Sequence, residues 1–144
     1  MKLRRITLQL TKSRRAYFKA AKAISELSDF KQHHIGCVAV YKHKIISSGY
    51  NSNRTNPKQK KLNKYRFTSD TNHTCHAELA CLLPLISRRD ICFKDVELYI
   101  YREHKNGELA LARPCAGCQA LIKELGIISI YYTNDGGYSH EIMY

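Results

Sequence analysis

Thr74-Cys75-His76-Ala77-Glu78 and Pro114-Cys115-Ala116-Gly117-Cys118 are the two stretches around which the rest of the sequence is organised. They bring one imidazole, two closely spaced thiols and one carboxylate. Zn²⁺ binds histidine nitrogen and cysteine sulfur in tetrahedral sites, and a catalytic zinc site keeps three protein ligands and leaves the fourth position for water. We therefore predict that His76, Cys115 and Cys118 bind Zn²⁺ and that Glu78 moves the protons of that water.

The spacing of these residues supports one shared site. Cys115 and Cys118 stand three residues apart at the start of a helix predicted to follow Pro114, so both sulfurs lie on one face. A helix N-terminus favours the thiolate, which is the form that binds metal. His76 opens a second predicted helix with Glu78 in its first turn. The alternative is a closed structural zinc site, with a fourth ligand from Cys75, His73 or another cysteine.

Working outward, helices and strands alternate along the chain. We predict a helix from a Ser13 cap to about Ser28, a helix from His76 that ends near Pro84, and a helix from Cys115 to a stop at Gly126. The first of these helices is expected to turn one apolar face inward, made of Ala16, Ala20, Ala23, Ile24 and Leu27. The predicted strands are 35–40, 44–49, 96–101 and 127–132, and the tail 133–144 is expected to be irregular or weakly helical. This order predicts an α/β fold, with a mixed sheet covered by helices on both faces.

Length, charge and cysteine content limit the function classes. A chain of 144 residues is expected to form a single domain, 1–144. No apolar run reaches membrane-spanning length and no signal peptide is visible, so we expect no membrane partner and a cytoplasmic location. Six cysteines beside a metal-type spacing favour metal chemistry over disulfides, and we interpret Cys37, Cys75, Cys81 and Cys92 as ordinary buried or semi-buried thiols. The net charge of +12 favours a polyanionic partner or a phosphorylated substrate, with solubility as an equal alternative.

A basic loop is predicted at about residues 52–73, between Asn51 at a strand end and the first metal ligand. Asn51 is a candidate for a hydrogen bond to the substrate, with a structural Asx-turn as the alternative. The loop also contains Tyr65 and Phe67, which could stack on a base or anchor the loop to the core. The candidate phosphate-binding residues of this loop are Arg54, Lys58, Lys60, Lys61 and Lys64. A solvated insertion without function is the competing interpretation.

Over residues 35–132 the sequence resembles the cytidine/deoxycytidylate deaminase superfamily. The resemblance rests on the strand Ile35–Val40, the run Ser48-Gly49-Tyr50-Asn51, and the H-x-E and P-C-x-x-C motifs, which are the signature of zinc-dependent nucleobase deaminases. It implies a three-layer helix–sheet–helix sandwich around a five-stranded mixed sheet. It also implies that His76, Cys115 and Cys118 hold zinc, that Glu78 shuttles protons, and that the protein forms a homo-oligomer. The expected substrate contacts are Asn51, Ala77 and Arg113.

Three functions follow as expectations. The favoured one is hydrolytic deamination of cytosine in a free (deoxy)cytidine nucleotide such as dCMP, a role in nucleotide metabolism. In having a histidine as the first metal ligand, the sequence is similar to the deoxycytidylate and nucleic-acid-editing branches of the superfamily. Ala80 is a departure, because deoxycytidylate deaminases often have asparagine two residues after the glutamate. The alternative is a deaminase that edits cytosine or adenine in DNA or RNA. A non-enzymatic, zinc-stabilised nucleic-acid-binding module is the third.

Overall fold

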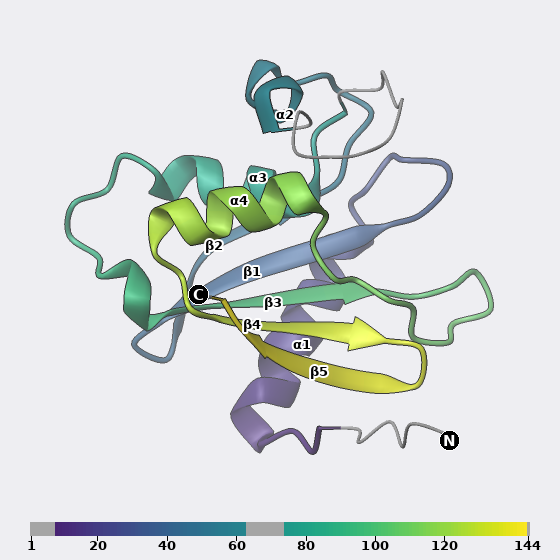
Figure 1. The fold of residues 1–144 in the computed structure, drawn as a ribbon. Coiled ribbons are helices and arrows are strands. Elements are labelled where there is room, and N and C mark those ends of the chain that lie inside the picture. Colours follow the sequence, from purple (N-terminus) through teal and green to yellow (C-terminus); the bar gives the residue numbers. More distant parts are fainter. Residues whose placement is uncertain (1–7, 63–73, 144) are drawn as a thin grey trace, which may run out of the picture.

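A five-stranded mixed sheet forms the centre of the protein, as the computed structural model in Figure 1 shows. The structure describes residues 8–62 and 74–143. The strands are β1 (Ile35–Tyr41), β2 (Lys44–Tyr50), β3 (Val96–Arg102), β4 (Ser129–Asn134) and β5 (Gly137–Ile142), in the spatial order β2-β1-β3-β4-β5. Only the β3–β4 pair is parallel within this sheet. The predicted α/β class and mixed sheet are therefore confirmed.

Helices cover both faces of the sheet, which confirms the three-layer prediction. Helix α1 (Lys12–Ser25) lies on one face, and α3 (Ala77–Leu82) and α4 (Ala116–Leu125) lie on the other (Figure 1). Helix α2 (Pro57–Leu62) lies beyond α4, and two 3₁₀ turns occupy Leu83–Leu85 and Phe93–Asp95. The early end of α3 at Leu82, before the turn that contains Pro84, was expected because proline cannot continue the hydrogen-bond ladder.

The predicted inward face of α1 is only partly right, because Ala20 and Ile24 are partly buried against the core but the fully buried residues are others. Helix α1 is capped by Thr11, whose side-chain oxygen accepts from the Arg14 N–H at 3.2 Å, and it buries Phe18, Ala21 and Ser25. The alanines used for the prediction, Ala16 and Ala23, are exposed, as is Leu27. Alanine has little apolar area, so one phenylalanine outweighs several alanines in deciding which face packs on the sheet.

Alternation along the strands builds two cores. On the α1 side, Phe18 packs with Val38, Val40, Tyr99 and Tyr131. On the opposite side, the neighbouring strand residues pack with α3 and α4, among them Cys37, Ala39, Leu98, Ile100 and Ile130. Because successive side chains point to opposite faces, a strand covered on both sides must be apolar throughout. Strand β1 was predicted as a buried strand for that reason.

The prediction for the C-terminal tail is wrong, because residues 137–142 form the edge strand β5. Residues 134–137 read Asn-Asp-Gly-Gly, and Gly136 has a φ of 130°, in the region that favours glycine. Asp-Gly between two strands is a strong hairpin signal. The hairpin places Tyr132 opposite Ser139 and Ser129 opposite Ile142.

Two further expectations change with the structure. The segment 52–73, predicted as a loop, contains α2 within its described part, and residues 63–73 lie outside the described residues. Cys92 is exposed, although a buried or semi-buried thiol was expected, whereas Cys37, Cys75 and Cys81 are buried. In the part of the chain that the structure describes, no helix has the length and apolar character to cross a bilayer.

Candidate active site

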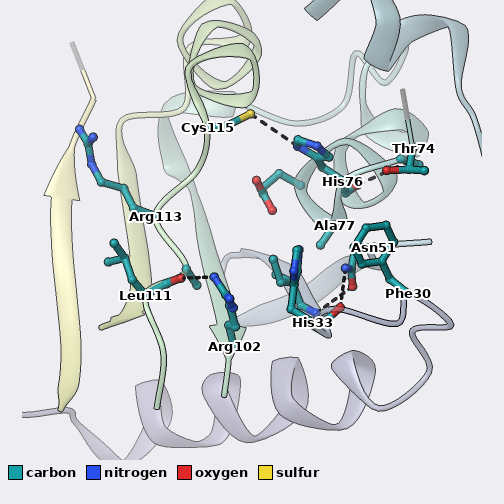
Figure 2. A pocket seen from close by; sticks show the side chains of 14 residues that line it. Phe30, His33, Asn51, Thr74, His76, Ala77, Arg102, Leu111, Arg113 and Cys115 are labelled. Atoms are coloured by element: carbon teal, nitrogen blue, oxygen red, sulfur yellow. Dashed lines mark hydrogen bonds between the residues drawn. The ribbon is translucent and has the colours of Figure 1, made fainter. Parts of the chain in front are cut away.

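The three predicted metal ligands come together at two helix starts. His76 is the N-cap residue of α3, Cys115 is the N-cap residue of α4, and Cys118 lies in the first turn of α4. The His76 Nδ1 atom lies 3.5 Å from the sulfur of Cys115 and 3.5 Å from that of Cys118. All three potential ligand atoms lie within 4.8 Å of one another. Figure 2 shows Cys115 and His76 facing each other at the rim of a pocket.

These distances fit zinc. Zn–S bonds of about 2.3 Å and Zn–N bonds of about 2.0 Å, at the tetrahedral angle, separate sulfur from nitrogen by about 3.5 Å. Among the described residues, this group contains three protein ligands, and Cys75 is not one of them. His73, the other residue considered as a fourth ligand, lies outside the described residues. Within the described residues, the donor set therefore has the three-ligand composition of a catalytic zinc site.

The protonation of the two cysteines favours metal binding. A hydrogen bond from Cys118, aided by His76, lowers the pKa of the Cys115 thiol to about 3. The pKa of the buried Cys118 thiol is raised, because it shares a hydrogen bond with the Cys115 sulfur and is removed from water. One thiolate is thus present before any cation arrives, and a bound cation favours loss of the second proton.

Close backbone packing positions the histidine. The buried Gln59 side chain of α2 accepts a hydrogen bond from the His76 N–H at 3.1 Å. Below α3, a Cβ added to Gly49 of β2 would lie 2.3 Å from the Cys81 nitrogen and 2.7 Å from the Ala77 carbonyl oxygen. Only glycine permits this approach between the helix and the strand. The ligand-bearing end of α3 is therefore fixed from two sides.

Glu78 is buried beside the metal ligands. Only 5% of the residue is exposed, and burial raises the pKa of its carboxyl group above the ordinary range, opposed by the nearby His76. Its carboxyl group is close enough to Cys118 for a hydrogen bond that lowers the pKa of Glu78 and raises that of Cys118. A carboxyl group held out of water next to the cation site can exchange protons at near-neutral pH.

A pocket of about 220 Å³ opens beside His76, Glu78 and Cys115. Its wall also includes the predicted substrate contacts Asn51, Ala77 and Arg113. The pocket residues that the sequence prediction missed are Phe30, His33, Ile35, Thr74, Cys75, Arg102, Leu111 and Ala112. Figure 2 shows Phe30, His33 and Arg102 on the side of the pocket opposite Cys115. Phe30 and His33 come from the α1–β1 connection and Arg102 from the end of β3, and no sequence motif marks these three residues.

Asn51 lies at the pocket and also has structural partners. Its Oδ1 accepts from the Ile35 N–H at 2.8 Å, and its Nδ2 donates to the His33 carbonyl at 2.9 Å. The Ser28 hydroxyl donates to the Asn51 carbonyl at 2.7 Å. Asn51 therefore holds the pocket-lining segment 33–35 against the end of β2. An amide has two N–H donors and two acceptor lone pairs, so these contacts leave hydrogen-bonding capacity for a ligand.

Arg113 reaches the pocket but is paired. Its guanidinium group donates to both carboxylate oxygens of Glu141 in β5, at 2.7 and 2.9 Å. Tyr132 donates to the same carboxylate at 3.1 Å. Figure 2 shows the side chain of Arg113 turned toward the edge strand. The charge of Arg113, an expected substrate contact, is thus already compensated by Glu141.

The basic residues in the described part of the 52–73 segment do not line the pocket. None of Arg54, Lys58, Lys60 and Lys61 lines it, and Lys64, Tyr65 and Phe67 lie outside the described residues. Helix α2 turns Gln59 and Leu62 inward and leaves Lys60 and Lys61 exposed. Its buried face supports the zinc site, and its lysines face solvent.

Comparisons with known proteins agree with this geometry. A family model described as the cytidine and deoxycytidylate deaminase zinc-binding region matches residues 11–134. No curated protein has a matching sequence. The fold resembles the apo dCMP deaminase of cyanophage S-TIM5, with a TM-score of 0.61 and 22% identity over 88% of this chain and 86% of that one. It resembles the cytidine deaminase of Burkholderia pseudomallei with the same TM-score of 0.61 and with 19% identity, over 93% of this chain and 94% of that one.

The cyanophage enzyme in complex with dCMP and dUMP gives a TM-score of 0.59 and 20% identity, over 86% of this chain and 83% of that one. At these identities the structural likeness concerns the fold. The family match and the donor set together confirm zinc as the cofactor. The chain therefore belongs to the family defined by the cytidine and deoxycytidylate deaminase zinc-binding region, which extends over residues 11–134.

Proposed function

We propose that the protein is a hydrolytic deaminase that acts on cytosine in a free (deoxy)cytidine nucleotide such as dCMP. Water replaces the exocyclic amino group, so the products are the uracil nucleotide and ammonia. One observation carries the proposal: His76, Cys115 and the buried Glu78 line the same pocket, with Cys118 completing the donor set. Ligands and carboxyl group thus face the space that a base would occupy.

His76, Cys115 and Cys118 would hold the zinc ion, which would supply a bound water with its pKa lowered to about 7. Glu78 then performs the proton transfers. Burial raises the pKa of its carboxyl group, which shifts the group toward the range in which an acid–base group is most effective at neutral pH. Glu78 accepts one proton from the attacking water and delivers it to the ring nitrogen of the base, then accepts the second proton from the added hydroxyl group and delivers it to the departing amino group as the carbonyl forms.

The remaining pocket residues would bind and orient the base. The volume of about 220 Å³ is below the roughly 300–1,000 Å³ typical of pockets for drug-sized ligands, so it suits one base rather than a larger group. Ala77 keeps the wall beside Glu78 small, and Asn51 supplies an amide. Phe30 and His33 pack as an aromatic pair, with ring centroids 5.0 Å apart, and present ring surface for stacking.

The choice of a nucleotide is supported by the cyanophage dCMP deaminase, whose structure contains dCMP and dUMP. A deamination screen over deoxycytidine, cytidine, dCMP, CMP, single-stranded DNA and RNA tests it. We expect ammonia to be released faster from the nucleotides than from the other compounds in the screen. In the same screen, Glu78→Gln should retain zinc and the folded circular-dichroism spectrum but lose at least about 10²–10⁴-fold in kcat. A Glu78→Gln variant with near-normal turnover of the preferred substrate would exclude the proposed role of Glu78.

Editing of a polynucleotide is the second candidate, and the net charge of +12 with exposed Lys60 and Lys61 on α2 favours it. Each phosphate contact contributes about one unit to the slope of log affinity against log salt concentration. Lys60→Ala with Lys61→Ala should therefore reduce that slope for single-stranded DNA or RNA if the polynucleotide is the substrate. An unchanged slope, with unchanged dCMP kinetics, would leave the free nucleotide as the only supported substrate.

A further inference from the structure

A second hollow adjoins the candidate active site and shares two residues with it. Its volume is about 350 Å³, and His33 and Arg102 line both hollows. Lys31 and Lys105 add positive charge to its wall, against Glu26 and Glu103. His33 and Arg102 therefore lie between the hollow proposed for the base and the second hollow.

Arg102 occupies this boundary without a carboxylate partner among the described residues. Its Nη1 donates to the Leu111 carbonyl at 3.3 Å, which is a long hydrogen bond, and its Nε is buried with no partner. By contrast, Arg113 on the same pocket donates twice to Glu141. A buried guanidinium donor without an acceptor is unfavourable, and a ligand oxygen would satisfy it.

The acid next to Arg102 in sequence is engaged elsewhere. Glu103 accepts a hydrogen bond of 2.6 Å from the Tyr101 hydroxyl, and its carboxylate lies 4.0 Å from the Lys22 ammonium group. The charge of Arg102 is thus available to a ligand. Burial lowers the pKa of the neighbouring His33, and the positive charge of Arg102 lowers it further. Figure 2 shows the side chains of Arg102 and His33 directed into the same pocket.

The backbone holds Arg102 in a fixed position. Ile35 pairs with Arg102 between β1 and β3. The buried Thr133 hydroxyl accepts from the Arg102 N–H at 3.1 Å and lies 3.2 Å from the Arg102 carbonyl oxygen. A guanidinium group on a fixed strand end matches a phosphate group in charge and in planar donor geometry.

We propose that Arg102, with His33 beside it, binds the phosphate group of the cytosine nucleotide where the two hollows meet. This inference rests on the proposed function and specifies its substrate as phosphorylated. It also replaces the expectation that the basic 52–73 segment binds the phosphate, because Arg54, Lys58, Lys60 and Lys61 line neither hollow among the described residues. The phosphate is either the monoester of a free nucleotide or a diester of a polynucleotide.

Equilibrium binding to the zinc-loaded protein tests the inference without turnover. The probes are dUMP and deoxyuridine, which carry the product base with and without phosphate. We expect the protein to bind dUMP at least about tenfold more tightly than deoxyuridine. Arg102→Gln should weaken dUMP binding by about 10- to 100-fold and leave deoxyuridine binding unchanged, because charge-assisted hydrogen bonds to the phosphate are removed. Arg102→Lys should retain part of the preference, since it keeps the charge but loses the planar fork.

The matched control is Arg88→Gln, which removes an equal charge from an exposed arginine paired with Asp90, distant in sequence from both hollows. It should change neither affinity. Equal loss of dUMP and deoxyuridine binding in Arg102→Gln, or no loss at all, would overturn the inference. If Arg102→Gln does not fold, the unaltered protein provides the test. The inference is overturned if this protein binds dUMP and deoxyuridine with equal affinity and inorganic phosphate does not compete with dUMP.

Failure of the proposed function is recognised separately. An Arg102-dependent preference for dUMP in a protein that deaminates nothing in the screen would support the phosphate site and reject the enzyme assignment. Deamination of dCMP by a protein that shows no such preference would support the enzyme assignment and reject the phosphate site. A trinucleotide with a central deoxyuridine and no terminal phosphate identifies the source: Arg102-dependent binding of this probe shows that the site accepts a diester.

Discussion

Replacing Gly49 with alanine would test whether the approach of α3 to β2 is necessary for the metal site. The added Cβ would lie 2.3 Å from the Cys81 nitrogen, 2.7 Å from the Ala77 oxygen and 2.7 Å from the Ala80 carbonyl carbon. All three are backbone atoms, so no side-chain rotation relieves the overlap. Since ordinary contact begins at 3.4 Å, α3 must move about 1 Å away from β2.

That displacement has two consequences of different size. Overpacking of a close-packed interface destabilises a protein by about 1–3 kcal/mol. At about 4 °C per kcal/mol for a chain of this length, the melting temperature should fall by about 4–12 °C. The shift also moves His76 and Glu78, which lie at the N-terminal end of α3. A misplacement of about 1 Å in a positioned group reduces the rate by about 10²-fold, so activity should fall more than stability suggests.

Thermal unfolding of the zinc-loaded protein and zinc release to a competing chelator measure these effects. Ser48→Ala is the matched control, because Ser48 is the preceding residue of β2 and is exposed, so its change should stay within about 0.5 kcal/mol. A Gly49→Ala protein with the melting temperature and zinc affinity of the control would refute the argument that this glycine determines the position of α3.

Three other outcomes are expected. Arg113→Gln should lower the free energy of unfolding by about 0.5–1 kcal/mol at pH 7, because the half-exposed Arg113 lowers the pKa of Glu141. A carboxylate whose pKa is lower in the folded state stabilises the protein above its unfolded pKa. Thermal melts of the two proteins should therefore converge as the pH falls through the folded pKa of Glu141. Zinc chelation should add Cys115, which is partly exposed, to the thiols that react with a disulfide reagent beyond the exposed Cys92, and an unchanged thiol count would contradict its role as a ligand. The family resemblance predicts self-association, and light scattering that shows a fully active monomer at micromolar concentration would contradict it.

The parts of the site that the sequence predicts are those encoded by short local motifs. His76 and Glu78 lie two residues apart, and Cys115 and Cys118 lie three residues apart, so one helix turn decides their relative orientation. Strands β1, β3 and β4 were predictable for a similar reason, since burial on both faces requires an uninterrupted apolar run. Strand β5 was missed because its residues alternate without a strong apolar face, and its turn signal at Asp135-Gly136 was not used.

The parts that the sequence does not predict depend on contacts between distant segments. Gln59 is one polar residue among lysines in a basic segment, yet it is fully buried and holds the His76 N–H. Phe30 and His33 belong to a connection without regular structure, and they line the pocket because Asn51 fixes that connection by two hydrogen bonds. No periodicity or spacing encodes such contacts, since each depends on the register of a sheet and the approach of a helix.

Arg102 and Arg113 show why the type of a residue near a motif does not decide its function. Both are arginines that line the same pocket, and only Arg113 stands beside a motif, before Pro114. The hairpin of β5 brings Glu141 to Arg113 and neutralises it, whereas β1 and β3 place Arg102 at the boundary of two hollows with its Nε unsatisfied among the described residues. The strand that was not predicted from the sequence is thus the one that pairs the charge of Arg113, an expected substrate contact. The electrostatics of the substrate site follow from sheet topology, because the topology decides which of two identical charges has a partner.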